Sequence, residues 1–200
     1  MRFTLCLLVL AMSGALAVAA ETAKPRVRLE TNKGTIIVEL EPAKAPKTVA
    51  NFLQYVRDGY YSNMIFHRCI KNFMIQGGGV TERFAGKPLR PPIENEAANG
   101  LRNTRGTIAM ARTGEVHSAT AQFFINLKDN PFLDYRDSTA EGFGYCAFGK
   151  VVSGLEVVDA IAAVPTGPAG PYASDVPKEP VIILKATVDE PAKAEPPPAK

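Results

Sequence analysis

F-H-R-C-I-K-N-F-M-I-Q-G-G-G, residues 66–79, is the stretch that decides how the rest of the chain is interpreted. It has the composition of a strand, a break at residues 71–72 and three consecutive glycines at its end. Alternate residues of an extended strand share a face. We therefore expect Phe66, Arg68 and Ile70 to point to one side of the strand. His67, Cys69 and Lys71 are expected on the other.

The second half of this stretch places apolar side chains near the arginine. In an extended segment Met74 and Gln76 point to one side, and Phe73 and Ile75 to the other. Arginine keeps its charge in proteins and is costly to bury without a partner. Arg68 beside Phe73 and Met74 therefore indicates a shallow apolar pocket with one fixed cation. A strand at a sheet edge, with Arg68 in water, is the alternative.

Length and charge limit the classes of protein that the chain can belong to. Its 200 residues, 46% of them hydrophobic, are enough for one well-buried domain and too few for two ordinary ones. The formal net charge is +3, and charges of both signs are interspersed. Such a weak field does not indicate a nucleic-acid partner.

The first twenty residues resemble a secretory signal peptide. Arg2 forms a short positive region, residues 3–10 an apolar run, and A-V-A at 17–19 a cleavage pattern. The run is too short for a stable membrane span. We expect residues 1–20 to be removed and the remaining chain to be exported, without a membrane anchor.

Export leaves two cysteines, Cys69 and Cys146. An oxidising compartment permits a disulfide between them. Both lie in apolar strand-like runs, where a free cysteine behaves as a small hydrophobic residue. We favour two buried thiols over a bridge.

Periodicity predicts a mostly β domain. A hairpin is expected over residues 27–31 and 35–40, with its turn at Gly34, and an amphipathic helix from Pro46 to Gly59. Further strands are expected at 106–112, 121–127, 145–152 and 181–187, a second helix at 155–162 followed by a Gly/Pro loop, and a long surface connection at 80–105. About eight strands without βαβ alternation favour a closed eight-stranded antiparallel β-barrel capped by two α-helices. We assign residues 21–188 to this domain and 189–200 to a disordered Pro/Ala/Lys tail.

Five motifs together resemble the cyclophilins, which are peptidyl-prolyl cis/trans isomerases. They are A-P-K-T-V-A-N-F at 45–52, F-H-R-x7-Q-G-G at 66–78, G-T-I-A-M-A at 106–111, Q-F-F-I at 122–125 and F-G-K-V at 148–151. Each is weak alone, but all five stand in the family's order from about residue 27 to 187. With the signal peptide, the chain is similar to exported bacterial members. This similarity implies the periplasm, with secretion as the alternative.

The resemblance implies a set of site residues and no cofactor or metal. The implied catalytic residues are Arg68, Gln76 and Phe73. The implied substrate-binding residues are Met74, Ala111, Arg112, Gln122, Phe124, Phe132, Leu133 and Tyr145. Two isolated histidines give no metal-ligand spacing, which agrees with that expectation.

These residue types suit rotation about an X–Pro bond. The barrier comes from amide resonance, so the catalyst needs only to bind the twisted amide better than either planar form. Arg68 would donate to the prolyl nitrogen as conjugation is lost, and apolar side chains would hold the proline ring. Gln76 would orient Arg68 or hold the substrate carbonyl, and Gln122 would support the same wall.

Three changes, the last of them at two adjacent positions, set the chain apart from the eukaryotic family pattern. Phe132 replaces a tryptophan and Tyr145 a histidine, so we expect weak or no cyclosporin binding but retained catalysis. Arg112 and Thr113 replace an Asn-Ala pair. Arg112 could add a second cation and favour acidic residues before proline, which is a hypothesis.

The expected partners are proline-containing polypeptides, namely exported proteins that are unfolded or folding, and the expected state is a monomer. The alternative function is a binding module or holdase that grips proline segments without turning them over. Such a binder has no use for a cation at the prolyl nitrogen, so Arg68 favours the enzyme. A third hypothesis is a barrel whose two cysteines report redox state.

Overall fold

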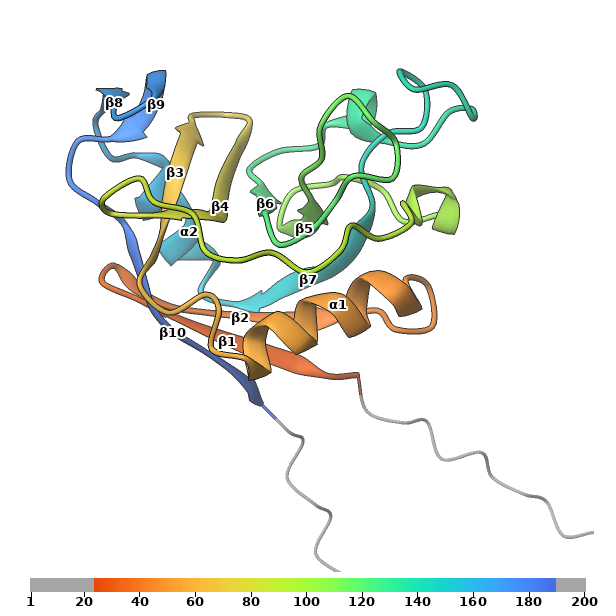
Figure 1. Ribbon diagram of the computed structural model, residues 1–200, viewed down its shortest axis with the longest axis horizontal. Helices are drawn as coiled ribbons and strands as arrows, with labels where there is room; N and C mark the ends of the chain where they lie inside the picture. The colour runs from red at the N-terminus through yellow and green to blue at the C-terminus, as the bar shows by residue number, and fades with distance from the viewer. Residues whose placement is uncertain (1–23, 190–200) are drawn as a thin grey trace, which may run out of the picture.

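The protein forms a closed antiparallel β-barrel, which confirms the predicted fold class. The structure is a computed structural model that describes residues 24–189. The barrel strands follow the order β1-β10-β3-β4-β6-β5-β7-β2. Their bounds are β1 Arg26–Thr31, β2 Gly34–Leu40, β3 Met64–Ile70, β4 Met74–Thr81, β5 Thr107–Met110, β6 Phe123–Asn126, β7 Ala147–Ser153 and β10 Ile182–Asp189 (Figure 1). The predicted signal peptide lies outside the described residues.

The two ends of the described chain lie side by side. Strands β1 and β10 pair antiparallel with Arg26 opposite Asp189, and Arg28 Nη2 lies 3.0 Å from the Asp189 carboxylate. The last strand therefore includes Asp189, a residue that we had assigned to the tail. The rest of the predicted tail, residues 190–200, lies outside the described part of the chain.

Helix α1, Pro46–Arg57, closes the barrel interior as its apolar stripe predicts. Val49, Phe52 and Val56 are buried in the main core. The Phe52 ring lies 5.3 Å from Tyr61, 5.6 Å from Phe123 and 5.2 Å from Phe148, measured between ring centroids. Aromatic contacts at this spacing add to the stabilisation from buried area alone. The second helix, α2 at Leu155–Ala162, buries Val158 and Ile161.

The first turn of α1 is capped by a residue distant in the sequence. The preceding Ala45 offers no side-chain cap. Instead the Glu96 carboxylate accepts from the backbone N–H of Lys47 at 3.1 Å and of Thr48 at 2.8 Å. A carboxylate there satisfies free backbone donors and complements the positive end of the helix. The predicted connection at 80–105 therefore holds α1 in place through Glu96. The only helical turn within residues 80–105 is the short 3-10 helix η1, Ala97–Asn99.

The predicted alternation along β3 is wrong for Cys69, which was expected on the face opposite Phe66. Phe66 and Cys69 are both buried in the main core, whereas Arg68 is exposed. The pairing of β3 with β4 shifts between Phe66 and Arg68, the mark of a β-bulge. A bulge inserts one extra residue and turns the side chains that follow, so Phe66 and Cys69 point to the same side.

A second small sheet was not predicted. Strands β8, Thr166–Ala169, and β9, Tyr172–Pro177, form an antiparallel pair where we expected only a Gly/Pro loop. Its Tyr172 ring lies 5.3 Å from the His67 ring, which is 3% exposed. The hairpin thus covers the outer face of β3, and burial lowers the pKa of His67.

Both cysteines in the described range are free buried thiols, as favoured from the sequence. Burial raises the pKa of Cys69 to about 12 and that of Cys146 to about 11. Reaction and oxidation of cysteine require the thiolate and access to solvent. Neither thiol meets these conditions, so the structure gives no support to the redox hypothesis.

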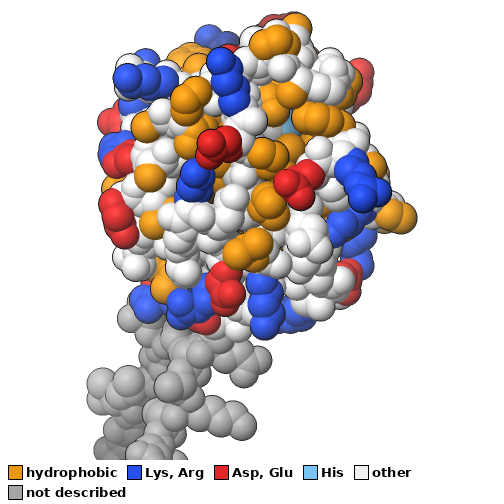
Figure 2. All heavy atoms as spheres, turned by 90° about the vertical axis from the view of Figure 1, so that its left-hand side faces the viewer, with side chains coloured by type: hydrophobic (Ala, Val, Ile, Leu, Met, Phe, Trp, Pro, Cys, Tyr) orange, Lys and Arg blue, Asp and Glu red, His pale blue; other side chains and the backbone are white. Residues whose placement is uncertain are grey.

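The surface carries mixed charge. On the face shown in Figure 2, basic, acidic and hydrophobic side chains alternate, and neither sign of charge gathers. No helix among residues 24–189 has the length and apolar character needed to cross a bilayer.

Candidate active site

The site is built on the outer face of four neighbouring strands. The register places Arg68 of β3 opposite Gln76 of β4, Gln76 opposite Phe124 of β6, and Phe124 opposite Ala109 of β5. These four residues form one row across the sheet. The neighbours of Phe124 along its strand, Phe123 and Ile125, point into the barrel. The core thus fixes which side chains face outward.

The row leads to a pocket with a volume of about 200 Å³. Nine of the eleven predicted site residues line it: Arg68, Phe73, Met74, Gln76, Ala111, Arg112, Phe124, Leu133 and Tyr145. Phe73 lies in the turn before β4 rather than on the opposite face of a strand, so it faces the same pocket as Met74. The floor is apolar, since Met74, Phe124 and Leu133 belong to a small cluster of buried residues outside the barrel interior.

The two remaining predicted residues lie directly behind or beside the lining. Gln122 Oε1 accepts a hydrogen bond of 2.9 Å from Gln76 Nε2 and so supports a wall residue. Phe132 is 59% exposed, and its ring stacks on that of Phe73 at 5.7 Å. An exposed aromatic ring at the rim offers contact area to whatever enters the pocket.

Arg68 has the freedom to meet a ligand. It is exposed, and within residues 24–189 its guanidinium has no hydrogen-bond or ion-pair partner. Gln76, which we expected to orient Arg68 or to hold a substrate carbonyl, donates from Nε2 to Gln122, and no side-chain hydrogen bond joins it to Arg68 in the described part of the chain. The first of those two roles is therefore absent here, and the second stays open.

The Arg112 side chain is hydrogen-bonded to backbone carbonyls of the protein itself. Its guanidinium donates to the carbonyls of Thr113, Gly114, Ala140 and Gly144 at 2.9–3.3 Å. It also lies 4.9 Å over the Tyr145 ring. With these donors engaged, Arg112 holds two loops against the pocket wall. This geometry does not support its use as a cation for acidic substrate residues.

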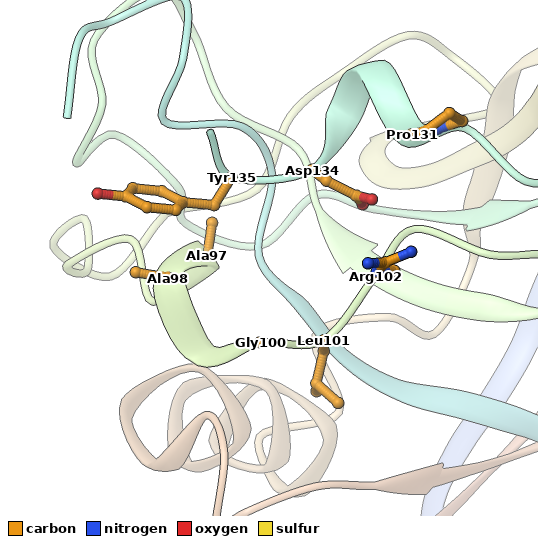
Figure 3. Close-up of a pocket in the computed structure, with 8 residues that line it drawn as sticks. All are labelled: Ala97, Ala98, Gly100, Leu101, Arg102, Pro131, Asp134 and Tyr135. Atoms are coloured by element: carbon orange, nitrogen blue, oxygen red, sulfur yellow. The ribbon is translucent and has the colours of Figure 1, made fainter. Parts of the chain in front are cut away.

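A larger, more open pocket of about 430 Å³ lies on the far side of the 3-10 helix η2, Pro131–Leu133. Figure 3 shows the side chains of Asp134 and Arg102 at this pocket, on neighbouring loops. Pro131 and Tyr135, which also line it, lie on opposite sides of Asp134 in this view. Because Leu133 lines the smaller pocket, η2 separates the two. No group of three or more potential metal-ligating side chains (His, Cys, Asp or Glu) occurs within residues 24–189.

Sequence reasoning missed the polar groups beneath the pocket. Asn103, Asn126 and Asn130 are 1%, 0% and 0% exposed. Their positions near the ends of strands and in turns favour an interpretation as turn formers. Nothing in their spacing shows that they meet.

Comparison with known proteins identifies the family. Residues 26–188 match the family described as cyclophilin type peptidyl-prolyl cis-trans isomerase/CLD. The chain belongs to this family. It is an enzyme of that class, a peptidyl-prolyl cis-trans isomerase.

Its relatives and structural neighbours agree. The chain is 55% identical over 164 residues to peptidyl-prolyl cis-trans isomerase B of Escherichia coli K12, covering 82% of this chain and 99% of that protein. It is 55% identical over 162 residues to the isomerase cyp18 of Streptomyces antibioticus, covering 81% and 97%. A crystal structure of a cyclophilin-type isomerase of Cryptosporidium parvum matches with a TM-score of 0.65 and 28% identity, covering 84% of this chain and 99% of the other.

Proposed function

We propose that the 200 Å³ pocket is the place where this isomerase binds and rotates the X–Pro bond, with Arg68 as the catalytic donor. The observation that supports this proposal is the position of the Arg68 guanidinium, which has no partner within residues 24–189, at the edge of a pocket with an apolar floor.

The chemistry requires neither a nucleophile nor a metal. Rotation about the peptide bond has a barrier of about 20 kcal/mol because the nitrogen lone pair is conjugated with the carbonyl. In the twisted state this lone pair is localised on the prolyl nitrogen. A donor from Arg68 stabilises that state and has nothing comparable to bind in the planar amide.

The apolar residues supply ground-state binding. Met74, Phe124 and Leu133 form a floor that is nearly inaccessible to water. A second crystal structure of the Cryptosporidium parvum cyclophilin was determined in the presence of the dipeptide Ala-Pro. It matches this chain with a TM-score of 0.64 and 28% identity, covering 83% of this chain and 99% of the other. We expect an X–Pro ligand of this chain to place its ring on the floor that Met74, Phe124 and Leu133 form.

The proposed clients are exported proteins that fold outside the cytoplasm. Support comes from the signal-peptide pattern in residues 1–20. The periplasm is the proposed location and a monomer the proposed state. Weak cyclosporin binding is also proposed, because Phe132 lacks an indole N–H that could donate to the drug.

Refolding of an exported protein whose slow phase is limited by proline isomerisation tests the function. We expect the wild-type chain to accelerate that phase at substoichiometric concentration, since the uncatalysed step takes tens of seconds or longer. A holdase would suppress aggregation and leave the rate unchanged. That outcome would contradict the proposed foldase role.

A further inference from the structure

Three buried asparagines form a hydrogen-bonded chain under the proposed proline pocket. Asn130 Nδ2 donates to Asn126 Oδ1 at 2.8 Å, and Asn126 Nδ2 donates to Asn103 Oδ1 at 3.2 Å. Asn103 in turn donates from its backbone N–H and from Nδ2 to the Asp134 carboxylate, at 2.7 and 3.2 Å. We call Asn103, Asn126 and Asn130 the asparagine network.

The side-chain nitrogens of Asn130 and Asn103 also reach the backbone of the pocket wall. Asn130 Nδ2 donates to the Phe73 carbonyl at 3.0 Å. Asn103 Nδ2 lies 3.2 Å from the Leu133 carbonyl and 3.1 Å from the Tyr145 carbonyl. Phe73, Leu133 and Tyr145 all line the pocket, yet they come from three separate segments of the chain. The network is the polar connection that these three segments share.

Two of the three backbone carbonyls that accept from the asparagine network already have another donor. The Phe73 carbonyl already accepts from the Leu127 N–H at 3.0 Å, and the Leu133 carbonyl from the Tyr145 N–H at 2.9 Å. The asparagine donors are therefore second donors to those two carbonyls. In addition, Asn130 Oδ1 is buried without a partner in the described structure. A buried acceptor without a partner is unfavourable, so the asparagine at position 130 carries a cost in stability. Its donated bonds to Asn126 Oδ1 and to the Phe73 carbonyl offset that cost.

We propose that Asn103, Asn126 and Asn130 are positioning residues, which set the shape of the proline pocket by fixing the backbone under Phe73, Leu133 and Tyr145. This inference rests on the proposed function, because it assumes that the proline ring enters the pocket. The network touches neither Arg68 nor its neighbour Gln76 on β4. It therefore acts on ground-state binding of the ring and leaves the cation that stabilises the twisted amide unchanged.

Asn130→Ala is the variant that tests the proposal most cleanly. It removes the donor to Phe73 but leaves that carbonyl bonded to the Leu127 N–H. It also removes the orphaned Asn130 Oδ1 while freeing Asn126 Oδ1, so the number of unpartnered acceptors stays the same. Asn130→Leu is the second variant, which keeps the number and branching of the side-chain heavy atoms and has no donor.

We expect both variants to raise KM for an X–Pro peptide by about three- to tenfold, the range that loss of one hydrogen bond produces, with kcat within about twofold of wild type. The methyl resonances of Met74 and Leu133 are expected to shift in the free enzyme. The matched control is Asn32→Ala, which removes an asparagine donor to the Pro180 carbonyl at the far hairpin turn. It should change neither KM nor these resonances.

Folded variants with wild-type KM and unmoved methyl resonances would overturn the proposal. A fall in both kcat and melting temperature with KM unchanged would also overturn it, because that result indicates a purely structural role. Failure of the proposed function gives a different result. If the ring does not enter this pocket, Phe124→Ala leaves KM unchanged, whereas the free-enzyme methyl shifts still report whether the asparagine network positions the wall.

Discussion

Arg68→Ala lowers kcat for X–Pro isomerisation by about a hundredfold or more, with a change in KM of less than about threefold. Removal of one preorganised donor to a developing charge in other enzymes costs about 10²–10³ in kcat. The reason for the small change in KM is that Arg68 has its partner only in the twisted state. Since Arg68 is exposed and has no partner within residues 24–189, its removal breaks no interaction that holds the fold. The measurement is steady-state turnover of a peptide substrate beside a thermal unfolding curve.

Arg68→Lys is the matched variant for charge. A lysine ammonium retains the positive charge but lacks the planar fork of donors and the reach of arginine. We expect it to recover little of the lost turnover. Full recovery would show that a diffuse positive charge is sufficient, and wild-type turnover in Arg68→Ala would exclude the proposed donor altogether.

Phe52→Ala destabilises the protein by about 3–5 kcal/mol, the usual range for truncating a buried phenylalanine. The Phe52 side chain is completely buried and contacts three other aromatic rings where α1 meets the barrel. Its removal leaves a cavity among rigid rings that cannot easily close. For a domain of this size the loss corresponds to a fall in melting temperature of about 6–20 °C.

Chemical denaturation with urea measures this loss as a shift of the midpoint at constant m-value. Leu89→Ala is the control, because Leu89 is 57% exposed and truncation there should change stability by less than about 0.5 kcal/mol. Equal stability of Phe52→Ala and wild type would mean that α1 does not depend on Phe52 for its docking on the barrel.

Periodicity predicted the elements whose burial is regular. The apolar stripe of α1 and the alternation along β1 and β2 follow directly from which face each element buries. The bulge after Phe66 was not predictable, because an inserted residue shifts the register without changing composition. The β8–β9 hairpin was missed because its glycines and prolines are typical of loops, although its antiparallel pairing tolerates them at an edge.

The candidate site also has a part that the sequence predicted and a part that only the tertiary structure reveals. Family motifs located Arg68 and the apolar pocket residues, and the barrel register then explains why strands distant in sequence bring them together. The asparagine network could not be found in this way. Its three side chains meet only through tertiary structure, as does the cap that Glu96 provides to α1.

The measurement that tests the central claim most directly is exchange NMR of an X–Pro peptide with the methyl-labelled enzyme. The account predicts accelerated cis/trans exchange together with chemical-shift changes at the methyl groups of Met74 and Leu133, which line the 200 Å³ pocket. Accelerated exchange with shifts confined to Ala98, which lines the larger neighbouring pocket, would place the reaction elsewhere. Shifts at Met74 and Leu133 without any acceleration would show a pocket that binds proline and does not rotate it.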